Sequence, residues 1–167
     1  MIIGIPKESL RGENRVAITP SGVEKLIAKG FDVQVQKNAG NKASFSDEEY
    51  QEAGATLVTK KKAWQSDVVV KINAPTLEET AELNDKAHYI SLLSPAQQPE
   101  LLAALNEKQV TALAMDMVPR MTRSQSMDVL SSMANIAGYR AVIEATHKFG
   151  RVLTGQITAA GNMPPAK

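Results

Sequence analysis

The segment Thr111-Ala-Leu-Ala-Met115, followed by Asp116-Met-Val-Pro119 and the loop Arg120-Met-Thr-Arg-Ser-Gln-Ser-Met-Asp128, shows how this chain is built. An apolar run ends at a proline, a polar loop follows, and a helical pattern extends from about Ser124 to Phe149. Strand, loop and helix start in this order are typical of a ligand site in an α/β protein. The loop carries two arginines, a carboxylate, an amide and three hydroxyls, but no obvious nucleophile. It predicts a site that holds a polar ligand rather than attacks one.

The same loop also fits a capped helix start. Thr122-x-x-Gln125 has the spacing of a capping box, and Asp128 suits the positive end of a helix dipole. Arg120 and Arg123 are left unexplained, because cations at a helix N-terminus are unfavourable by roughly a few tenths of a kcal/mol. From the residue pattern alone, a ligand site and a capped helix start are equally open.

Strand and helix patterns alternate along the rest of the chain. Short apolar or alternating runs predict strands, and N-caps or prolines open each helix between them. This alternation predicts a three-layer α/β fold, a parallel sheet flanked by helices of the flavodoxin or Rossmann type. The strands are predicted at Ile2–Ile5, 31–36, 56–58, 67–72, 89–93 and 111–115. Since ligands lie at the carboxyl ends of parallel strands, Lys7, Arg15, Lys71, Ser94 and the Arg120 loop could converge on one crevice.

Composition excludes several classes of function. The 167 residues make about one domain, and 19 basic against 18 acidic residues give no basic excess for nucleic acid. Without cysteine there is neither a disulfide nor a thiolate ligand, and His88 and His147 have no metal-site spacing. No metal site and no membrane span are predicted. The N-terminal run indicates a first strand rather than a signal peptide, so a soluble cytoplasmic chain is expected.

The C-terminal part predicts a helix end and then a crossover. His147 and Lys148, with Gly150 after them, form a helix C-terminus, which makes His147 a dipole partner rather than a catalyst. Beyond Gly150 the chain is a Gly/Pro loop with no closing element. We therefore expect an α/β domain over residues 1–150 and, over 151–167, a crossover towards a further domain.

Three stretches carry a family resemblance. Gly4-Ile-Pro-Lys-Glu8, Asn14-Arg-Val-Ala-Ile-Thr-Pro20 and Leu130-Ser-Ser-Met-Ala-Asn-Ile-Ala-Gly-Tyr-Arg140 resemble the N-terminal part of the alanine dehydrogenase and transhydrogenase family. Within it, Arg120–Asp128 and Gly155-Gln-Ile-Thr-Ala-Ala-Gly161 are similar to the alpha subunit of the proton-translocating NAD(P) transhydrogenase. The resemblance covers essentially the whole chain.

The resemblance implies the first half of a two-lobed NAD-binding domain. In this family hydride passes between NAD(H) here and NADP(H) on a partner domain, coupled to proton translocation. The implied partners are the rest of the alpha subunit, the beta subunit and a second copy in a homodimer, on the cytoplasmic side of the inner membrane. Because the family's G-x-G-x-x-G turn is not in this sequence, we expect this stretch alone to bind NAD weakly or not at all and to be inactive.

The resemblance also assigns roles within the Arg120 loop. Arg120, Gln125, Asp128 and Ser131 would contact the nicotinamide, its ribose or the facing nucleotide. Gln125 would act by positioning, with no acid or base role. The residues implied to shape the loop are Met121, Thr122, Ser126 and Met127.

Two other functions are open. An alanine dehydrogenase-like oxidoreductase would use Arg15 and Lys71, which match that enzyme's substrate-binding residues. Its catalytic histidine, however, would follow Leu93, where this chain has Ser94-Pro95, so the acid–base partner is missing. We expect Arg15 and Lys71 to be structural here, paired with Glu8 or Glu13. The other alternative is a non-catalytic assembly or dimerisation module.

Overall fold

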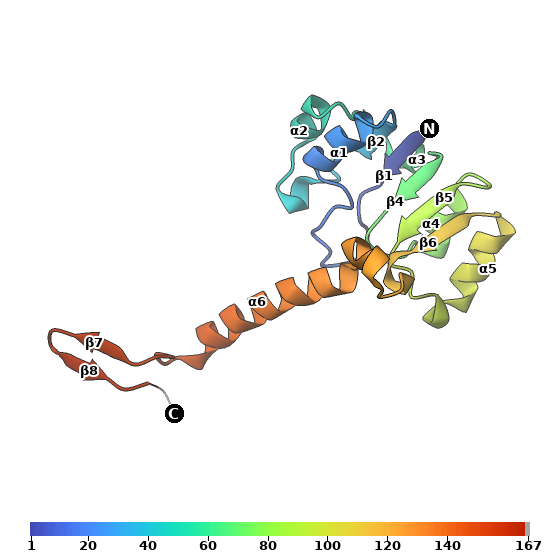
Figure 1. The fold of residues 1–167 in the computed structure, drawn as a ribbon. Coiled ribbons are helices and arrows are strands. Elements are labelled where there is room, and N and C mark those ends of the chain that lie inside the picture. The colour runs from blue at the N-terminus through green and yellow to red at the C-terminus, as the bar shows by residue number, and fades with distance from the viewer. Residues whose placement is uncertain (166–167) are drawn as a thin grey trace. The chain divides into compact units, whose positions relative to one another are not determined.

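The computed structural model describes residues 1–165 (Figure 1). The chain divides into two compact units, Met1–Met127 and Asp128–Lys167. The first unit contains a six-stranded sheet and the second a long helix and a two-stranded sheet. The two units are described separately below.

All six strands of the first unit run parallel, in the order β3-β2-β1-β4-β5-β6. This is the order of a dinucleotide-binding Rossmann sheet, so the predicted α/β fold is confirmed and is of the Rossmann rather than the flavodoxin type. The strands are β1 Ile2–Ile5, β2 Asp32–Gln36, β3 Thr56–Val58, β4 Val68–Val70, β5 His88–Ser91 and β6 Thr111–Ala114.

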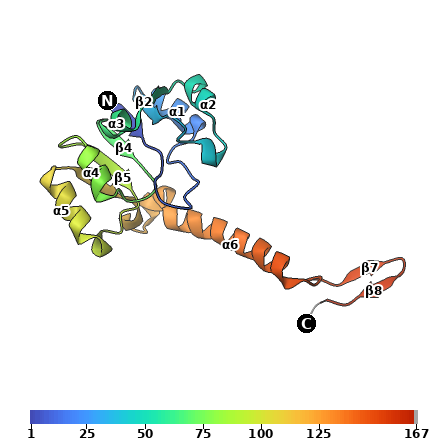
Figure 2. The same ribbon diagram turned by 180° about the vertical axis from the view of Figure 1, so that it is seen from behind.

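Helices cover both faces of this sheet (Figures 1 and 2). One apolar cluster joins the first two helices to β1 and β2 around Val23, Val35 and Tyr50. The other joins the remaining helices to β4 and β5 around Trp64 and Tyr89. The helices are α1 Pro20–Ile27, α2 Asp47–Glu52, α3 Lys60–Trp64, α4 Leu77–Glu82 and α5 Pro99–Glu107, with 3-10 helices η1 Asn41–Ala43 and η2 Pro95–Gln97. The sheet is therefore the middle of three layers.

Gly4 shows how closely α3 packs on the sheet. A Cβ at this position would lie 2.0 Å from the Ala63 carbonyl oxygen and 2.5 Å from Ser66 Oγ. No side chain fits in that space, so β1 requires glycine where the end of α3 crosses it.

The local helix signals in the sequence are confirmed. Thr19 caps α1 with Pro20 in its first turn, and capping boxes at Ser46–Glu49 and Thr76–Glu79 open α2 and α4. Gly30, with φ +86°, donates to Ile27 while the next residue donates to Leu26, which is the Schellman ending expected of a C-terminal glycine.

The predicted start of the last helix is wrong. Residues Thr122–Met127 form a 3-10 helix, η4, and α6 begins only at Val129 and runs to Phe149. Thr122 is not the N-cap. Asp128 caps α6 instead, accepting from Ser131 N at 3.0 Å and Ser131 Oγ at 2.7 Å. Aspartate and threonine are both good N-cap residues, so the capping rules alone do not decide between the two starts.

The end of α6 agrees with the sequence, but the segment after it does not. His147 and Lys148 lie in the last turn, and Gly150 follows with φ +67°. The expected loop instead contains an antiparallel hairpin of β7 Gln156–Thr158 and β8 Gly161–Met163. Strands of three residues are too short to show a periodic pattern. The predicted crossover at 151–167 remains a prediction, and residues 166 and 167 lie outside the described residues.

Candidate functional site

The strand order reverses between β1 and β4, and the carboxyl ends of these strands carry a cluster of charged residues. Ligands in open α/β sheets bind outside such a switch point. Glu8 follows β1, and Lys71, Ile72 and Asn73 follow β4. The Glu8 carboxylate accepts hydrogen bonds from the Ile72 N–H at 2.7 Å, the Asn73 N–H at 3.4 Å and Asn73 Nδ2 at 3.2 Å. A side chain of the protein itself therefore joins the two strand ends.

Lys71 is buried in this cluster, with 1% of its side chain exposed. Its Nζ lies 2.9 Å from Glu79 Oε2 and 3.9 Å from Glu8 Oε2, and 5.2 Å from the centre of the Trp64 ring. Burial raises the pKa of Glu79, but hydrogen bonds from Lys71 and Ser9 more than offset this, and the pKa lies below its ordinary value. Glu79 is ionised at neutral pH, so Lys71 has its counterion within the fold.

Arg15 is engaged in the same way. Its Nε and Nη2 donate to the two carboxylate oxygens of Glu13 at 2.8 and 2.7 Å, and Asn73 Nδ2 donates to Glu13 at 3.0 Å. The hydrogen bond from Arg15 is the main reason why the pKa of Glu13 falls to about 2. The expected pairing with Glu8 or Glu13 thus holds for Arg15, whereas Lys71 lies closer to Glu79 than to Glu8.

Sequence reasoning missed Glu79 as a member of this cluster. Its place three residues after Thr76 was fully explained by a capping box, and the structure confirms that box. The same carboxylate oxygen, Oε2, accepts from the Thr76 N–H at 3.1 Å and from Lys71 Nζ. No signal in the sequence distinguishes a capping glutamate that also neutralises a buried lysine from one that does not.

A second carboxylate, that of Asp116, joins the segments that follow β5 and β6 at the carboxyl ends of the strands. Asp116 lies directly after β6 in the 3-10 helix η3 Met115–Met117, and its two oxygens accept the N–H groups of Leu93 and Ser94, each at 2.8 Å. Burial raises the pKa of Asp116, and these backbone hydrogen bonds more than offset it, so the pKa is lowered. The sequence interpretation did not single out Asp116.

The predicted loop Arg120–Met127, called the η4 loop below because it contains η4, follows η3 and has most of its polar side chains exposed to solvent. Ser124 is its one buried residue: Oγ donates to the Pro119 carbonyl and contacts the Met121 backbone, which tightens the segment into η4. Arg120, Arg123 and Gln125 are exposed, and within residues 1–165 none of their side chains makes a hydrogen bond or ion pair. Met121 and Met127 are half-exposed beside them. Thr122 and Ser126 are exposed as well.

The two remaining predicted residues lie in the second unit. Asp128 and Ser131 contact one another through the N-cap of α6. The structure therefore groups the predicted residues into the η4 loop on the first unit and a capping pair on the second.

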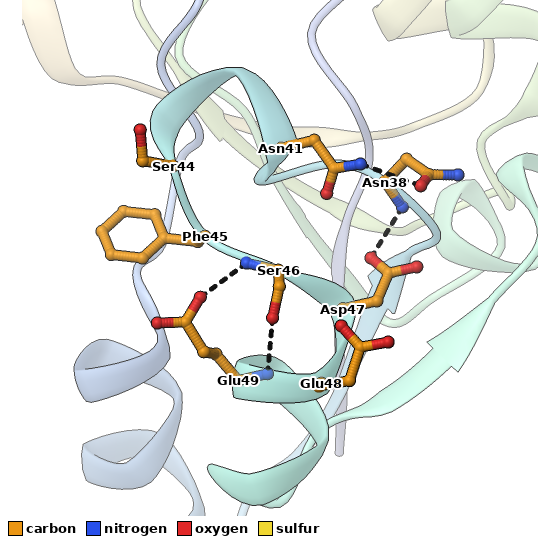
Figure 3. A pocket seen from close by; sticks show the side chains of 8 residues that line it. All are labelled: Asn38, Asn41, Ser44, Phe45, Ser46, Asp47, Glu48 and Glu49. Carbon is orange, nitrogen blue, oxygen red and sulfur yellow. Dashed lines mark hydrogen bonds between the residues drawn. The ribbon is translucent and has the colours of Figure 1, made fainter.

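The surface cavities do not coincide with these residues. An open cavity of about 560 Å³ is lined by the turn before α2 and its first residues (Figure 3), and another of about 430 Å³ lies between the starts of α4 and α5. In the first, Asp47 accepts from Asn38 N at 2.8 Å and Glu49 from Ser46 N at 2.6 Å, so two of the three carboxylates that line it accept hydrogen bonds from the backbone. Across the described residues no group of three or more histidine or acidic side chains could hold a metal ion. In the same part of the chain, no helix combines the length and apolar character needed to cross a membrane.

Comparison with known proteins identifies the family of this chain. Residues 4–137 match the family described as "Alanine dehydrogenase/PNT, N-terminal domain". The chain belongs to this family, which confirms the resemblance.

Within the family, the chain is more similar to transhydrogenases than to the alanine dehydrogenases compared. It is 54% identical over its whole length to "NAD(P) transhydrogenase subunit alpha" of Haemophilus influenzae and covers 33% of that protein. The solved transhydrogenase from Sinorhizobium meliloti superposes with a TM-score of 0.94 at 42% identity, over 99% of this chain and 50% of that one. The alanine dehydrogenase of Bacillus subtilis is 38% identical over 84% of this chain and 37% of its own length. The chain thus spans a third to a half of the proteins it matches.

Proposed function

We propose that this chain is the N-terminal part of the alpha subunit of a proton-translocating NAD(P) transhydrogenase. In the complete protein it would help to pass hydride between NAD(H) and NADP(H). The observation that carries the proposal is the exposed η4 loop at the carboxyl edge of the sheet, where Arg120 and Gln125 have no partners among the described residues. The similarity to transhydrogenase alpha subunits supports it.

The residues present fit one end of a dinucleotide. Arg120 offers a fork of N–H donors for phosphate or ribose oxygens, and the Gln125 amide both donates and accepts. Met121 and Met127 add apolar surface beside them, and Thr122 and Ser126 add hydroxyls. The family resemblance also implies nucleotide contacts by Asp128 and Ser131, which belong to the second unit. The sequence lacks the glycine-rich turn that grips a pyrophosphate, so these side chains would orient the nicotinamide end rather than supply most of the affinity.

The chemistry asked of this chain is modest. When bound, NAD and NADP supply the hydride donor and acceptor, and the protein has to bring them together. The η4 loop contains no histidine, cysteine, lysine or carboxylate, which is compatible with that role. Gln125 would position a nicotinamide and transfer no proton.

The proposal extends to partners and location. NAD(H) would contact this chain and NADP(H) a separate partner domain. The rest of the alpha subunit, the beta subunit and a second copy in a homodimer would complete the assembly. The chain would work at the cytoplasmic face of the inner membrane, with proton translocation in the membrane part.

Two observations favour this function over alanine oxidation. Ser94 stands where alanine dehydrogenases carry their histidine, and Arg15 and Lys71 already hold the carboxylates of Glu13 and Glu79. A substrate carboxylate would have to displace these internal partners. A purely structural assembly module is less well supported, because the relatives reported above are named as subunits or structures of enzymes.

The test is hydride transfer by the complete protein that contains this chain. Transfer from NADH to NADP⁺, or to an analogue with a distinct absorbance, is the expected result. Alanine-dependent reduction of NAD⁺ without such transfer would favour the alanine dehydrogenase alternative. Neither activity, in a protein that is folded and assembled, would favour the assembly module.

A further inference from the structure

We propose that Asp116 is a positioning residue for the η4 loop, which fixes where Arg120 and Gln125 lie along the carboxyl edge of the sheet. This inference rests on the proposed function, because it concerns the same loop. It names a residue that lies outside the loop and would not itself touch a nucleotide.

The first line of evidence is the way in which Asp116 joins two strand ends. Its Oδ1 accepts from Leu93 N and its Oδ2 from Ser94 N, both at 2.8 Å, so one carboxylate holds two successive N–H groups beyond β5. Leu93 is buried, and its carbonyl accepts from Gln98 Nε2 at 2.8 Å. The loop after β5 is therefore itself held by burial and hydrogen bonds, and Asp116 attaches the segment after β6 to it.

Ser94, one of the two residues that Asp116 contacts, has an uncommon backbone conformation. Ser94 has φ +45° and ψ +56°, in the left-handed region that non-glycine residues rarely adopt, and Pro95 follows it. Such conformations persist only where the surroundings hold them. The hydrogen bond from Ser94 N to Asp116 Oδ2 is one contact that does so, and it links this turn directly to η3.

The η4 loop then lies between two anchors. Asp116 ties its beginning to the β5 loop, and Ser124 ties its second half back to the Pro119 carbonyl. Arg120 lies between these anchors and Gln125 directly follows the second, while their side chains are exposed. Loss of the first anchor would let the whole loop shift as a body, because its internal hydrogen bonds would remain. Hydride transfer is sensitive to displacements of about 1 Å, whereas binding is less so.

Asp67, at the amino ends of the parallel strands, is a matched control. Asp67 precedes β4, and its Oδ2 accepts from the Ile2 N–H at 2.7 Å, which ties β4 to the start of β1. Asp67 is exposed, as Asp116 is, and it too binds backbone N–H. It lies at the amino edge, away from η4. A loss of hydride transfer in the variants of both aspartates would reflect lower stability. A loss in the Asp116 variant alone would reflect displacement of the η4 loop.

The experiment compares Asp116→Asn, Asp116→Glu and Asp67→Asn in the complete assembled protein. Single-turnover hydride transfer from NADH to NADP⁺, an NADH titration and thermal unfolding are measured for each. In Asp116→Asn we expect hydride transfer to fall roughly tenfold or more while NADH affinity changes less than about threefold. Asp116→Glu should recover most of the rate, and Asp67→Asn should leave the rate within about twofold even where the melting temperature drops. Equal rates in Asp116→Asn and Asp67→Asn would overturn the inference.

A second readout works without any nucleotide. Arg120 and Arg123 are exposed trypsin sites in the η4 loop, so brief tryptic digestion of the folded protein reports how firmly the loop is held. Asp116→Asn should speed cleavage after these arginines several-fold, and Asp67→Asn should not. If the wild-type protein transfers no hydride, the proposed function fails, and this digestion alone decides the role of Asp116. Unchanged cleavage in Asp116→Asn would then refute it.

Discussion

Replacement of Lys71 by methionine tests whether the charge cluster at the switch point is a desolvated ion network. Methionine keeps most of the volume of the lysine stem but removes the cation. Two buried carboxylates, Glu8 and Glu79, would then face the same space without it. Removing one partner of a buried ion pair costs about 3–5 kcal/mol, because the remaining charge is left uncompensated. We expect Lys71→Met to lower the free energy of unfolding by this amount.

The distances indicate which carboxylate is destabilised more when the Lys71 cation is removed. Glu79 lies 2.9 Å from Lys71 Nζ and Glu8 lies 3.9 Å from it, with 4% and 2% of their side chains exposed. Glu8 keeps three donors from Ile72 and Asn73, whereas Glu79 loses its closest cation. The double variant Lys71→Met/Glu79→Gln removes both charges of the shorter pair and retains an oxygen for the capping contact. It should be destabilised by only about 1–2 kcal/mol, well below the single variant.

The assay is urea unfolding of this chain followed by tryptophan fluorescence. Trp64 is the one tryptophan in the sequence, is fully buried and stacks on Tyr89 at 6.1 Å, so the signal comes from the first unit. Lys108→Met is the control: Lys108 donates to the carbonyl oxygens of Ala81 and Leu83 and lies 3.9 Å from Asp85 Oδ1, but its side chain is 27% exposed. A cost below about 1 kcal/mol for Lys71→Met, or a double variant no more stable than the single one, would refute the reasoning. Hydride transfer in the complete protein should change by less than about tenfold, or 1.4 kcal/mol.

Three further outcomes are expected. Gln125→Asn should slow single-turnover hydride transfer up to about a hundredfold. NADH affinity and melting temperature should barely change, because Gln125 is exposed and caps no helix, and equal losses in rate and affinity would contradict this. Glu13→Gln should lower the free energy of unfolding above about pH 4.5, and its difference from wild type should shrink as pH falls towards 2. The reason is that the pKa of Glu13 is about 2 in the folded protein and 4.5 ordinarily, so the carboxylate loses its charge, and with it the interaction with Arg15, only near the lower value. A pH-independent difference in urea midpoints would contradict this. This chain alone should bind NADH more weakly than about 100 micromolar, or −5.5 kcal/mol, and transfer no hydride, which calorimetry and an activity assay can check.

Most of the fold could be predicted because its signals are local. The N-caps at Thr19, Ser46 and Thr76 each act within one turn of helix, and the apolar runs mark strands without reference to any partner. The order of the strands is different in kind. The position of β4 beside β1 rather than β3 results from a crossover to the other face of the sheet, and no residue of that connection encodes it alone.

The sequence predicted the candidate loop but not the residues that hold it in place. The position of the loop after the last parallel strand pointed to Arg120 and Gln125 as ligand contacts, which stays a prediction, and both side chains are exposed in the structure. The helix start was misplaced, because Thr122 and Asp128 both satisfy the rules for an N-cap and only the fold selects between them. Asp116 could not be identified, since its partners at Leu93 and Ser94 are backbone groups, which carry no sequence signal.

The two groups of polar residues at the carboxyl ends of the strands differ in whether their cations have partners within the chain. At the β1–β4 switch point, the cations of Arg15 and Lys71 are matched by carboxylates of the chain and further fixed by the amide of Asn73. A ligand carboxylate there would have to replace short, partly buried bonds, which is unfavourable unless its own contacts are better. Beyond β6, Arg120 and the Gln125 amide have no such partners among the described residues, so a ligand gains their hydrogen bonds without breaking others. On energetic grounds a polar ligand should therefore bind at the η4 loop and not at the switch point, and alanine or pyruvate should not compete with NADH for this chain.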